Sequence, residues 1–504
     1  MNVHQSALPV LIVLIPLVTA FTLPVLGLWY RPAVFPAALT ALVFACGASI
    51  AAAREVMVNG PLHYYMGGWA PPWGIEFRID SLSALMLLLL TVITVLVGIY
   101  SKRSVLKEIP SKDVPFYSVY LLMVTGLVGL VSTADMFNLY VFLEITSLSS
   151  YALVSIGGGA AVVSAFRYVI LGTVGAAFYL LSVGYLYSVT GSLNMADLSR
   201  ILPGLYESNA VLVAFAFFVV GMSIKMALFP MHTWLPGAYA DAPSAVSALV
   251  AATSTKVAAY VLVRVMFFVF EPRFSVEMIP VASLLAWMGA VAMVLGSVMA
   301  IAQTDFKRML AYSSVAQIGY IVLGVGLANT MGFTGGILHL VNHAFMKCGL
   351  FLVAGAIVYR TGLRTISEFY LLSVKMPWTA ATFTVCAFAM IGIPPMGGFF
   401  SKLYLILGAI DAGNWTFVVV IVLSSVLALA YLGNVLRYMY FPEELTTGRV
   451  GGRPVPEAIK RDDVPWTMLV PMLAVAAGVV LLGLFNGEVV GRFIEPGMPI
   501  GLER

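Results

Sequence analysis

The sequence predicts an all-α integral membrane protein of about fourteen transmembrane helices, with two inverted five-helix repeats that each contain a broken helix. Three observations predict this fold. The 504 residues are 61% hydrophobic and only 10% charged, whereas soluble domains carry roughly 45–50% apolar and about 25% charged residues. Apolar runs of about 20 residues, enough to cross a bilayer core of about 30 Å, recur along the whole chain. Two of these runs combine prolines with polar or glycine residues in a way that predicts a broken helix.

The whole chain, residues 1–504, is expected to form a single polytopic membrane domain, because no segment is long and polar enough to fold separately in water. Residues 1–113 hold helices 1–3, 114–268 the first repeat (helices 4–8) and 278–440 the second repeat (helices 9–13). Residues 441–504 hold a polar loop and helix 14. The expected spans are 7–29, 33–53, 79–100, 114–133, 136–156, 165–189, 209–229, 244–268, 278–302, 309–328, 333–358, 377–408, 414–439 and 466–487.

Lysine and arginine in the loops predict the orientation, because cytoplasmic loops carry the excess of these residues. The side without the termini is expected to be cytoplasmic, with both termini outside. The group Asp305, Lys307 and Arg308 at a helix start is expected to anchor that cytoplasmic side. The cytoplasmic set is Arg31, Lys102, Arg103, Lys107, Lys112, Lys307, Arg308, Arg360, Arg364, Lys375, Arg449, Arg453, Lys460 and Arg461, against Arg54, Arg78, Arg200, Arg273, Arg492 and Arg504 on the other side.

Two helices are expected to be broken. Pro230 and Pro236 interrupt KMALFPMHTWLPGAYADAP, and Pro394 and Pro395 interrupt MIGIPPMGGFFSK. Proline removes a helical donor and clashes with the preceding turn. Broken helices at corresponding places in two halves are typical of inverted-repeat transporters, in which freed backbone lines a hydrated site. The breaks lie five helices apart, which favours a repeat of helices 4–8 with 9–13 over two incidental kinks.

A buried acid and a buried lysine form the first candidate site. A charge at the bilayer centre costs at least about 2.5–3.5 kcal/mol, so each one requires a reason. Glu144 lies mid-membrane in DMFNLYVFLEITSLSSYALV, and Lys225 lies just before the first break. Each favours the charged form of the other, so a proton gained or lost by one changes the affinity of the next site. The alternative is a static structural ion pair.

Lys256 is a second candidate. It lies in ALVAATSTKVAAYVLVRV, directly after Thr253, Ser254 and Thr255, whose hydroxyls can hold water beside the ammonium group. No acidic residue lies nearby in the sequence. A buried lysine without a local acid is more easily explained as a group that binds and releases a proton than as structural glue.

His339, His343 and Lys347 follow the spacing i, i+4, i+8 in GGILHLVNHAFMKCGLF. This spacing places all three on one helix face, about 6 Å apart along the axis. Histidine titrates near neutral pH, so such a row can relay protons sideways through a hydrated interior. A lone histidine is more often a satisfied core residue, but two histidines and a lysine on one stripe favour function. A metal site would need more ligands.

Lys402 follows the second break in GGFFSKLYLIL, and it is expected to play in the second half the part that Lys225 plays in the first. His232 lies between Pro230 and Pro236 in the first break. Two interpretations of His232 stay open: it gates or feeds the Lys225 site, or it makes a structural hydrogen bond in the broken segment.

Several function classes are excluded or disfavoured. Cys46, Cys348 and Cys386 each stand alone in an apolar run, so an iron–sulfur, haem or zinc site is not expected, nor is any cofactor or bound metal. The chain is therefore expected to carry no redox centre of its own, although it can belong to a redox-driven enzyme complex. The net charge of +4 is too small to suggest a nucleic-acid partner.

These motifs resemble the Mrp-type multisubunit sodium/proton antiporters, in a superfamily that includes antiporter-like subunits of respiratory complex I and of membrane-bound hydrogenases. The resemblance rests on ADMFNLYVFLEITSLSSYALV, MALFPMHTWLPGAYADAPSAVSALVAATSTKVAAYVLVRV, QTDFKRMLAYSSVAQIGY, LHLVNHAFMKCGLF and GIPPMGGFFSKLYL, and it runs from about residue 75 to 440. The short C-terminus points to the D-type antiporter subunit, and FNLYVFLE is closer to the Mrp type than to complex I.

The resemblance implies the fourteen-helix fold with inverted repeats, and it implies roles for the candidate residues. Glu144 and Lys225 would form the first-half pair, Lys256 the connecting lysine and Lys402 the second-half lysine. The row of His339, His343 and Lys347 matches the family's central hydrophilic axis. Arg167 stands where many relatives have lysine, and because arginine does not titrate it is not expected to carry protons.

The function expected from these features is that of a proton-translocating, antiporter-like subunit, which moves protons, in exchange for sodium, through a buried chain of Glu, Lys and His. Its expected place is the plasma membrane, and its expected partners are the lipid bilayer and other membrane subunits of an Mrp-like, hydrogenase-like or complex I-like assembly. Two alternatives stay open: the pump module of a redox complex such as a hydrogenase or an NADH or ferredoxin dehydrogenase, and a scaffold that transports nothing.

Overall fold

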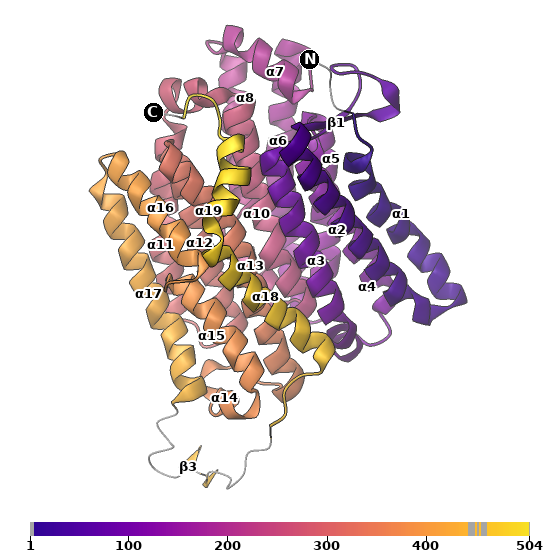
Figure 1. Ribbon diagram of the computed structural model, residues 1–504, viewed down its shortest axis with the longest axis vertical. Coiled ribbons are helices and arrows are strands. Elements are labelled where there is room, and N and C mark those ends of the chain that lie inside the picture. The colour runs from indigo at the N-terminus through magenta and orange to yellow at the C-terminus, as the bar shows by residue number, and fades with distance from the viewer. Residues whose placement is uncertain (1–4, 442–448, 451–452, 455–460, 503–504) are drawn as a thin grey trace.

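The protein is a bundle of near-parallel helices, shown in the computed structural model of Figure 1, which describes residues 5–441, 449–450, 453–454 and 461–502. Among these residues, twelve helices are individually long and apolar enough to cross a membrane. Two broken helices, each made of two shorter segments, supply two further crossings. The predicted all-α membrane fold is thus confirmed, and the crossings number fourteen as expected.

The elements that cross the bundle are α1 (Leu8–Trp29), α2 (Val34–Asn59), α3 (Ser81–Glu108), α4 (Asp113–Ser132), α5 (Met136–Ser155), α6 (Ala160–Thr190), α8 (Asn209–Lys225) with α9 (Leu235–Asp241), α10 (Ser244–Phe268), α11 (Val281–Ile301), α12 (Phe306–Gly326), α13 (Thr330–Thr361), α15 (Pro377–Ile391) with α16 (Gly397–Asp411), α17 (Trp415–Tyr440) and α18 (Trp466–Leu484). The shorter elements are η1 (Arg31–Ala33), β1 (Leu62–Tyr65), η2 (Met66–Gly68), β2 (Glu76–Ile79), α7 (Met195–Ile201), η3 (Leu202–Leu205), η4 (Arg273–Met278), η5 (Ile366–Glu368), α14 (Leu372–Lys375), β3 (Arg449–Val450), β4 (Arg453–Pro454), α19 (Asn486–Val489), η7 (Val490–Ile494) and η8 (Glu495–Gly497).

Short polar side chains fix where several spans begin. Asp80, Asp135, Asp305 and Asn329 each precede a long helix, and the side chain of each accepts a hydrogen bond from the backbone N–H three residues later. These bonds satisfy donors that have no partner within the helix. Asp135 caps α5 in this way, since its side chain accepts from Asn138 N at 2.7 Å.

The two predicted breaks are present. In the first, α8 ends at Lys225 and α9 starts ten residues later, with Pro230 between them. Trp234 reaches back from the break and donates its indole N–H to the Ile224 carbonyl at 3.0 Å. In the second, Pro394 and Pro395 separate α15 from α16. Pro230, Pro394 and Pro395 are exposed at the two breaks, whereas Lys225 and Trp234 beside the first break are buried.

The inverted repeat is visible in a pair of backbone hydrogen bonds that recurs at opposite ends of the bundle. In the first half, Met136 N donates to Leu193 O at 2.8 Å, and Met195 N donates to Ala134 O at 2.9 Å, which ties the start of α5 to the end of α6. In the second half, the same ladder ties the start of α12 to the end of α13, through Phe306 N to Arg364 O and Ile366 N to Thr304 O, both at 2.9 Å. The recurring ladder relates α5 and α6 to α12 and α13, which agrees with the expected repeat of helices 4–8 with helices 9–13.

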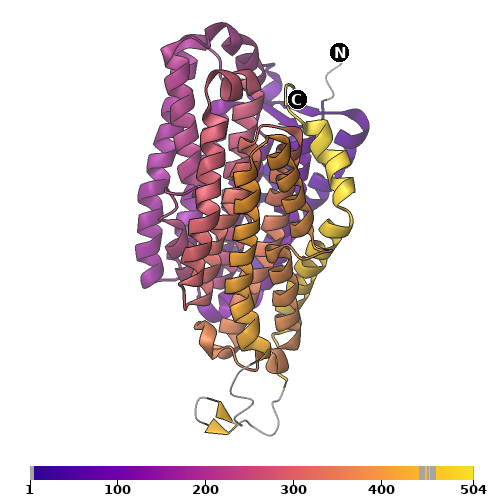
Figure 2. The same cartoon turned by 90° about the vertical axis from the view of Figure 1, so that its left-hand side faces the viewer.

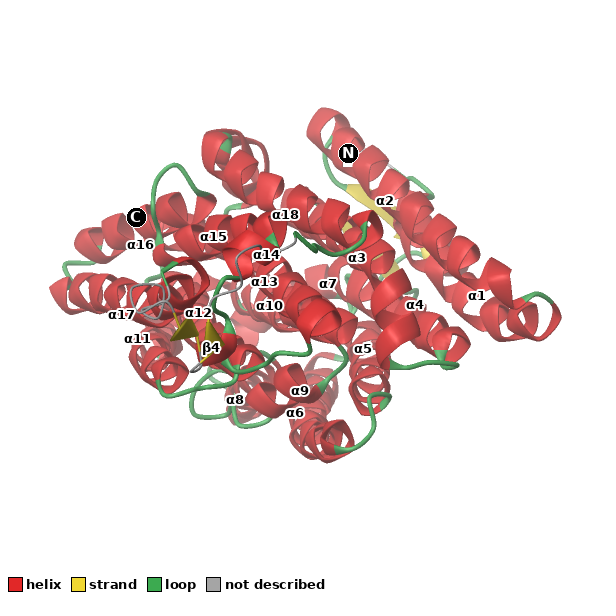
Figure 3. Cartoon of the chain, turned by 90° about the horizontal axis from the view of Figure 1, so that it is seen from below, coloured by secondary structure: helices red, strands yellow, loops and turns green. Residues whose placement is uncertain are grey.

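The helices divide into a buried centre and an apolar rim. Seen along the bundle, α10 and α13 lie in the middle, with α1 and α2 at one edge and α11, α16 and α17 at the opposite edge (Figure 3). Side chains of α10 and α13 are almost wholly buried, whereas α1, α2 and α17 expose rows of large apolar residues. An apolar outer surface of this kind is what a bilayer requires of a spanning bundle.

The two ends of the bundle are named here the terminal face and the basic face. The terminal face holds the start of α1, the β1–β2 hairpin, α7 and η8, and the basic face holds η1, α14 and the β3–β4 strands (Figures 1 and 2). Glu76 of β2 joins the hairpin to the first repeat, since its carboxylate contacts His63 at 2.6 Å and accepts a bond from Asn194 at 2.8 Å. Burial alone raises the pKa of Glu76, but these two hydrogen bonds and the charges of His63 and Arg78 hold it below its usual value.

The two sets of basic residues that predicted the orientation lie on opposite ends of the bundle as far as the structure describes them. Lys460 and Arg504 lie outside the described residues. The expectation of a surface anchor is wrong for Lys307, which is 3% exposed. Its ammonium group turns inward and donates to the carbonyl of Ala242, between α9 and α10, at 2.7 Å.

The orientation can be tested with single cysteines on the two faces. Ser111 is an exposed residue between α3 and α4 on the basic face, and Glu207 is an exposed residue before α8 on the terminal face. The excess of basic loops predicts that Ser111→Cys reacts with a membrane-impermeant maleimide only from the cytoplasm and Glu207→Cys only from outside. The unmodified chain, with its own three cysteines, is the control, and the reverse labelling pattern contradicts the orientation.

Candidate functional site

Glu144 and Lys225 meet beside the first break, as the sequence predicts. The Lys225 ammonium group, at the last residue of α8, lies 3.8 Å from Glu144 Oε1. Its hydrogen bond goes instead to Ser147 Oγ on α5, at 2.7 Å. Glu144 Oε1 has no hydrogen-bond partner among the described residues, although the side chain of Glu144 is only 27% exposed. The pair is therefore in electrostatic contact without being locked by a direct hydrogen bond.

Lys256 is fully buried on α10, at the centre of the bundle. Its ammonium group donates to the carbonyl of Ala251 at 2.5 Å and lies 3.4 Å from the Thr255 hydroxyl. Of the three hydroxyls that precede it in the sequence, only that of Thr255 is in contact with it. No acidic side chain pairs with Lys256 in the part of the chain that the structure describes, as the sequence suggested.

The row on α13 is fully buried. His339 contacts Ser401 Oγ and Gln317 Oε1, both at 2.9 Å. The rings of His339 and His343 are stacked with centroids 6.1 Å apart. Neither ring nitrogen of His343 has a partner among the described residues. An imidazole with two unsatisfied nitrogens in a buried site requires ordered water, which is also the medium that a proton relay uses.

Lys347 ends the α13 row and bonds to α12. Its ammonium group donates to the Leu310 carbonyl at 2.7 Å and to Ser313 Oγ at 2.5 Å. Lys256 is close enough for its charge to act on Lys347 and on both histidines. The connecting lysine and the histidine row therefore form one electrostatic unit, which spans α10 and α13.

Lys402 extends this electrostatic unit toward the outer edge of the bundle. Its ammonium group donates to the carbonyls of Met390 and Ile391, at 2.8 and 3.0 Å, and to Ser425 Oγ at 3.0 Å. The same group lies 4.8 Å from the centre of the Tyr320 ring, and this ring is tilted against that of His339 with centroids 5.0 Å apart. A cavity of about 290 Å³ lies beside Lys402, between α15, α16 and α17.

The two halves place their lysines on different sides of the break. Lys225 is the last residue before the first break, and Lys402 lies in the segment after the second. The Lys402 side chain nevertheless reaches back to the last carbonyls of α15, so both ammonium groups lie at the carboxyl end of a half-helix. This is the end at which the helix dipole stabilises a cation.

His232 lies in the first break and packs against aromatic rings. Its ring stacks on Phe229 with centroids 5.2 Å apart and lies 6.4 Å from that of Tyr312. No hydrogen bond joins it to Lys225, and its Nδ1 is buried without a partner among the described residues. A cavity of about 370 Å³ on the basic side is lined by its neighbours Thr233 and Trp234. His232 itself does not line this cavity, so its contacts in the structure are those with the two aromatic rings.

The structure thus forms two units. The first holds Glu144 and Lys225, and the second holds Lys256, His339, His343, Lys347 and Lys402. No hydrogen bond joins the units among the described residues. No group of three His, Cys, Asp or Glu side chains in that part of the chain is arranged to hold a metal ion. The contacts that sequence reasoning missed are the hydroxyls and amide that hold the charged groups, namely Ser147, Ser313, Gln317, Ser401 and Ser425.

The fold and the site define a class of protein: a polytopic membrane subunit with inverted repeats and a line of buried lysines and histidines. Residues 133–428 match the family described as NADH:quinone oxidoreductase/Mrp antiporter, TM. Residues 71–103 match the family described as NADH-Ubiquinone oxidoreductase (complex I), chain 5 N-terminus. The chain belongs to the NADH:quinone oxidoreductase/Mrp antiporter family of membrane subunits.

Similar proteins come from both branches of this family. The chain is 45% identical to the NADH-quinone oxidoreductase subunit N of Desulforudis audaxviator over 98% of each chain. It is 30% identical to the D-type subunit of the Na(+)/H(+) antiporter of Alkalihalophilus pseudofirmus over 89% of each chain. It also superposes on a chain of the archaeal membrane-bound sulfane sulfur reductase with a TM-score of 0.88 at 29% identity, covering 99% of this chain and 98% of that one.

These similarities confirm that the chain belongs to the predicted superfamily, and they confirm the expectation that its partners are other subunits of a multisubunit membrane complex. They do not favour the Mrp type over complex I, since the 45% identical relative is a subunit N. The preference for a D-type antiporter subunit rested on a short C-terminus and one motif, and the subunit N relative matches this chain over 98% of both lengths.

A substitution at Lys402 tests whether this residue must release its proton. Lys402→Arg keeps the positive charge, and the adjacent cavity of about 290 Å³ leaves room for the larger group. Arginine stays protonated in proteins, so a relay through position 402 stops. We expect Lys402→Arg and Lys402→Ala both to lose most proton uptake in membrane vesicles, normalised to assembled complex, while Lys402→Glu keeps a measurable part.

The matched control is Lys102→Arg, because Lys102 is exposed on the basic face and outside the site. This variant is expected to transport at the parental rate. Normal transport by Lys402→Arg would show instead that Lys402 is a fixed structural charge, and the proton would then have to leave by another route.

Proposed function

We propose that this antiporter-like subunit carries protons across the membrane through the line Glu144, Lys225, Lys256, His339, His343, Lys347 and Lys402. The observation that carries the proposal is that the four lysines and two histidines of this line are buried inside a membrane bundle, and that Glu144 is their one acidic partner among the described residues. Buried charges that served structure alone would be paired. Backbone carbonyls and hydroxyls hold these ammonium groups without neutralising them, so each can gain or lose a proton when a neighbour changes charge.

Protons fit this line better than sodium ions. Sodium, a hard cation, requires several oxygen ligands such as carboxylates and carbonyls in one place. Along the proposed line Glu144 is the sole carboxylate among the described residues, and the other ionisable groups are bases that repel a metal cation. A role for sodium would therefore require a separate path, supplied by a partner subunit of the complex.

A redox-driven complex is the host that we favour for the subunit. The chain matches a NADH-quinone oxidoreductase subunit N at 45% identity over nearly its whole length, compared with 30% for a D-type antiporter subunit. The chain superposes on a subunit of a sulfane sulfur reductase complex as well. The described residues contain no redox site, so partner chains would hold the redox centres, with the basic face toward the cytoplasm of the cell. A stand-alone Mrp-like antiporter is the second candidate, supported by the D-type antiporter relative.

Replacing the carboxylate of Glu144 tests the transport role. Glu144→Gln keeps the size of the side chain but removes its charge, so protonation changes at Lys225 can no longer be coupled to it. We expect transport to fall to the background level in vesicles in which the complex is assembled. The matched control, Glu207→Gln, changes an exposed acid before α8 and is expected to leave transport unchanged. Normal transport in assembled Glu144→Gln membranes would remove Glu144 from the route.

Purification of the complex tests the host. A tag on this chain is expected to recover partner subunits that carry iron–sulfur clusters, visible by electron paramagnetic resonance after reduction. If the purified complex contains membrane subunits alone, shows no such signal and exchanges sodium for protons in liposomes, the antiporter is the host.

A further inference from the structure

A second polar row leaves Lys256 and runs along α10 toward the terminal face. Lys256, Tyr260 and Arg264 follow the spacing i, i+4, i+8, so they share one face of the helix at steps of about 6 Å. The Tyr260 ring is 3% exposed. Its hydroxyl accepts a hydrogen bond from Arg264 Nε at 3.2 Å and lies 3.5 Å from the Val131 carbonyl. Tyr260 and Arg264 are not part of the line described above, and the row they form points out of the bundle.

The row ends in a partly buried ion pair. Arg264 donates from its second terminal nitrogen to Asp80 Oδ2 at 2.6 Å and lies 3.3 Å from Ser83 Oγ. The side chains of Arg264 and Asp80 are only 14% and 15% exposed. The guanidinium group also lies over the rings of Tyr260 and Phe268. Such packing fixes the arginine in one place, between the tyrosine hydroxyl and the terminal face.

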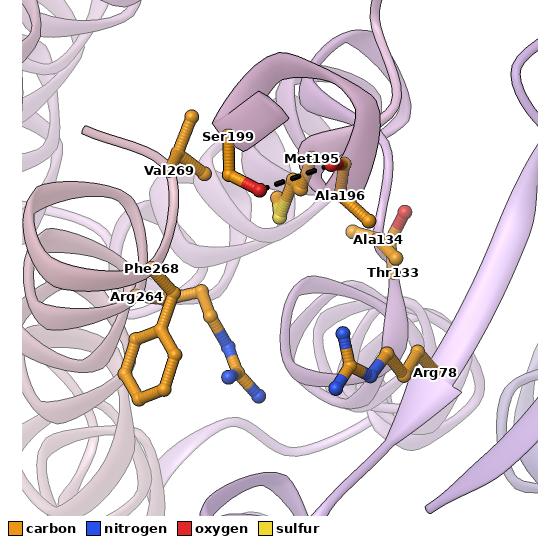
Figure 4. A pocket seen from close by; sticks show the side chains of 9 residues that line it. All are labelled: Arg78, Thr133, Ala134, Met195, Ala196, Ser199, Arg264, Phe268 and Val269. Atoms are coloured by element: carbon orange, nitrogen blue, oxygen red, sulfur yellow. Dashed lines mark hydrogen bonds between the residues drawn. The ribbon is translucent and has the colours of Figure 1, made fainter. Parts of the chain in front are cut away.

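Beyond the ion pair lies a small cavity that leads outward. Its volume of about 100 Å³ is large enough for several water molecules. Arg264 and Arg78 point into it from opposite sides, and Thr133 and Ser199 add hydroxyls to its wall (Figure 4). Arg78 Nε is buried without a partner among the described residues, and water in the cavity would satisfy it. A second cavity of about 540 Å³ also borders Arg78 and Phe268, on the side of η4.

The chemistry of arginine makes this arrangement a barrier to protons. A guanidinium group has five donors and no acceptor, so it cannot take a proton from Tyr260 and pass it on. Its charge, together with that of Arg78 across the cavity, also repels any approaching cation, as arginine does in selective membrane pores. The polar row is therefore interrupted at Arg264. The Lys256 ammonium group bonds to Ala251 and Thr255 and not to Tyr260, so the step from Lys256 to Tyr260 requires water between them.

We propose that the Arg264–Asp80 ion pair is the gate at the terminal end of the proton route. The Tyr260 hydroxyl is the last relay group inside the gate, and the cavity between Arg264 and Arg78 is the water-filled exit. The gate is closed in this structure, and it opens when the Arg264 side chain moves off the Tyr260 hydroxyl. The inference rests on the proposed function, since it assumes that Lys256 carries protons.

Removing the charge of Arg264 is the direct test. Arg264→Gln, and the double variant Asp80→Asn/Arg264→Gln, which leaves no unpaired carboxylate, open the row without changing side-chain size greatly. We expect the passive proton conductance of vesicles that hold assembled complex to rise by about tenfold. This is the lower end of the range by which a local electrostatic potential changes the local concentration of ions. Adding Tyr260→Phe to either variant is expected to return the conductance to the parental level. The matched control, Arg200→Gln, changes an exposed arginine of α7 outside the cavity and is expected to leave the vesicles tight.

A labelling experiment reads the gate without relying on proton transport. In Tyr260→Cys, an impermeant thiol reagent added from the terminal side is expected to react only when Arg264→Gln is also present. Labelling without a proton leak would support the gate and count against Lys256 as a proton carrier. Tight vesicles and an unreactive Tyr260→Cys in assembled Arg264→Gln complex would overturn the gate itself.

Discussion

The physical constraint on which this structure depends is that a buried ammonium group must find acceptors inside the bundle. Four of the buried lysines solve it in the same way, by bonding to backbone carbonyls: Lys256 to Ala251, Lys307 to Ala242, Lys347 to Leu310 and Lys402 to Met390 and Ile391. A carbonyl offers a lone pair but no negative charge. The ammonium group is therefore held in place while its charge stays uncompensated, and it responds strongly to any change of charge nearby.

The two halves of the inverted repeat use this solution unequally. In the first half the break leaves Lys225 beside an acid and a hydroxyl, and Trp234 occupies a freed carbonyl. In the second half the freed carbonyls at the end of α15 bind the lysine itself. The Lys402 ammonium group reaches them only because α16 approaches α15 closely: a Cβ at Gly398 would lie 1.9 Å from the Ala389 carbonyl. One fold thus supplies one lysine with a counter-charge and the other with dipoles alone.

The sequence revealed the parts of this arrangement that depend on local pattern. Apolar runs predicted the crossings, prolines predicted the breaks, and the i, i+4 spacing on α13 predicted the histidine row. The groups that hold the charges were not predictable, because Ser147, Gln317 and Ser425 are ordinary polar residues until tertiary packing brings them to an ammonium or imidazole group. The burial of Lys307 was missed for a similar reason, because a lysine at a helix start resembles a surface anchor. Only the course of the first broken helix places the Ala242 carbonyl where the Lys307 ammonium group can bond to it. Arg264 was likewise hidden, since its partner Asp80 is 184 residues away.

The recurring backbone ladder has a mechanical consequence for the two halves. It joins α5 to α6 at the terminal face and α12 to α13 at the basic face, so each pair of helices is tied by backbone hydrogen bonds at one end. Among the described residues, each half thus has its backbone tie at the face where the other half has none of this kind. A small rotation about such a tie displaces the far end most.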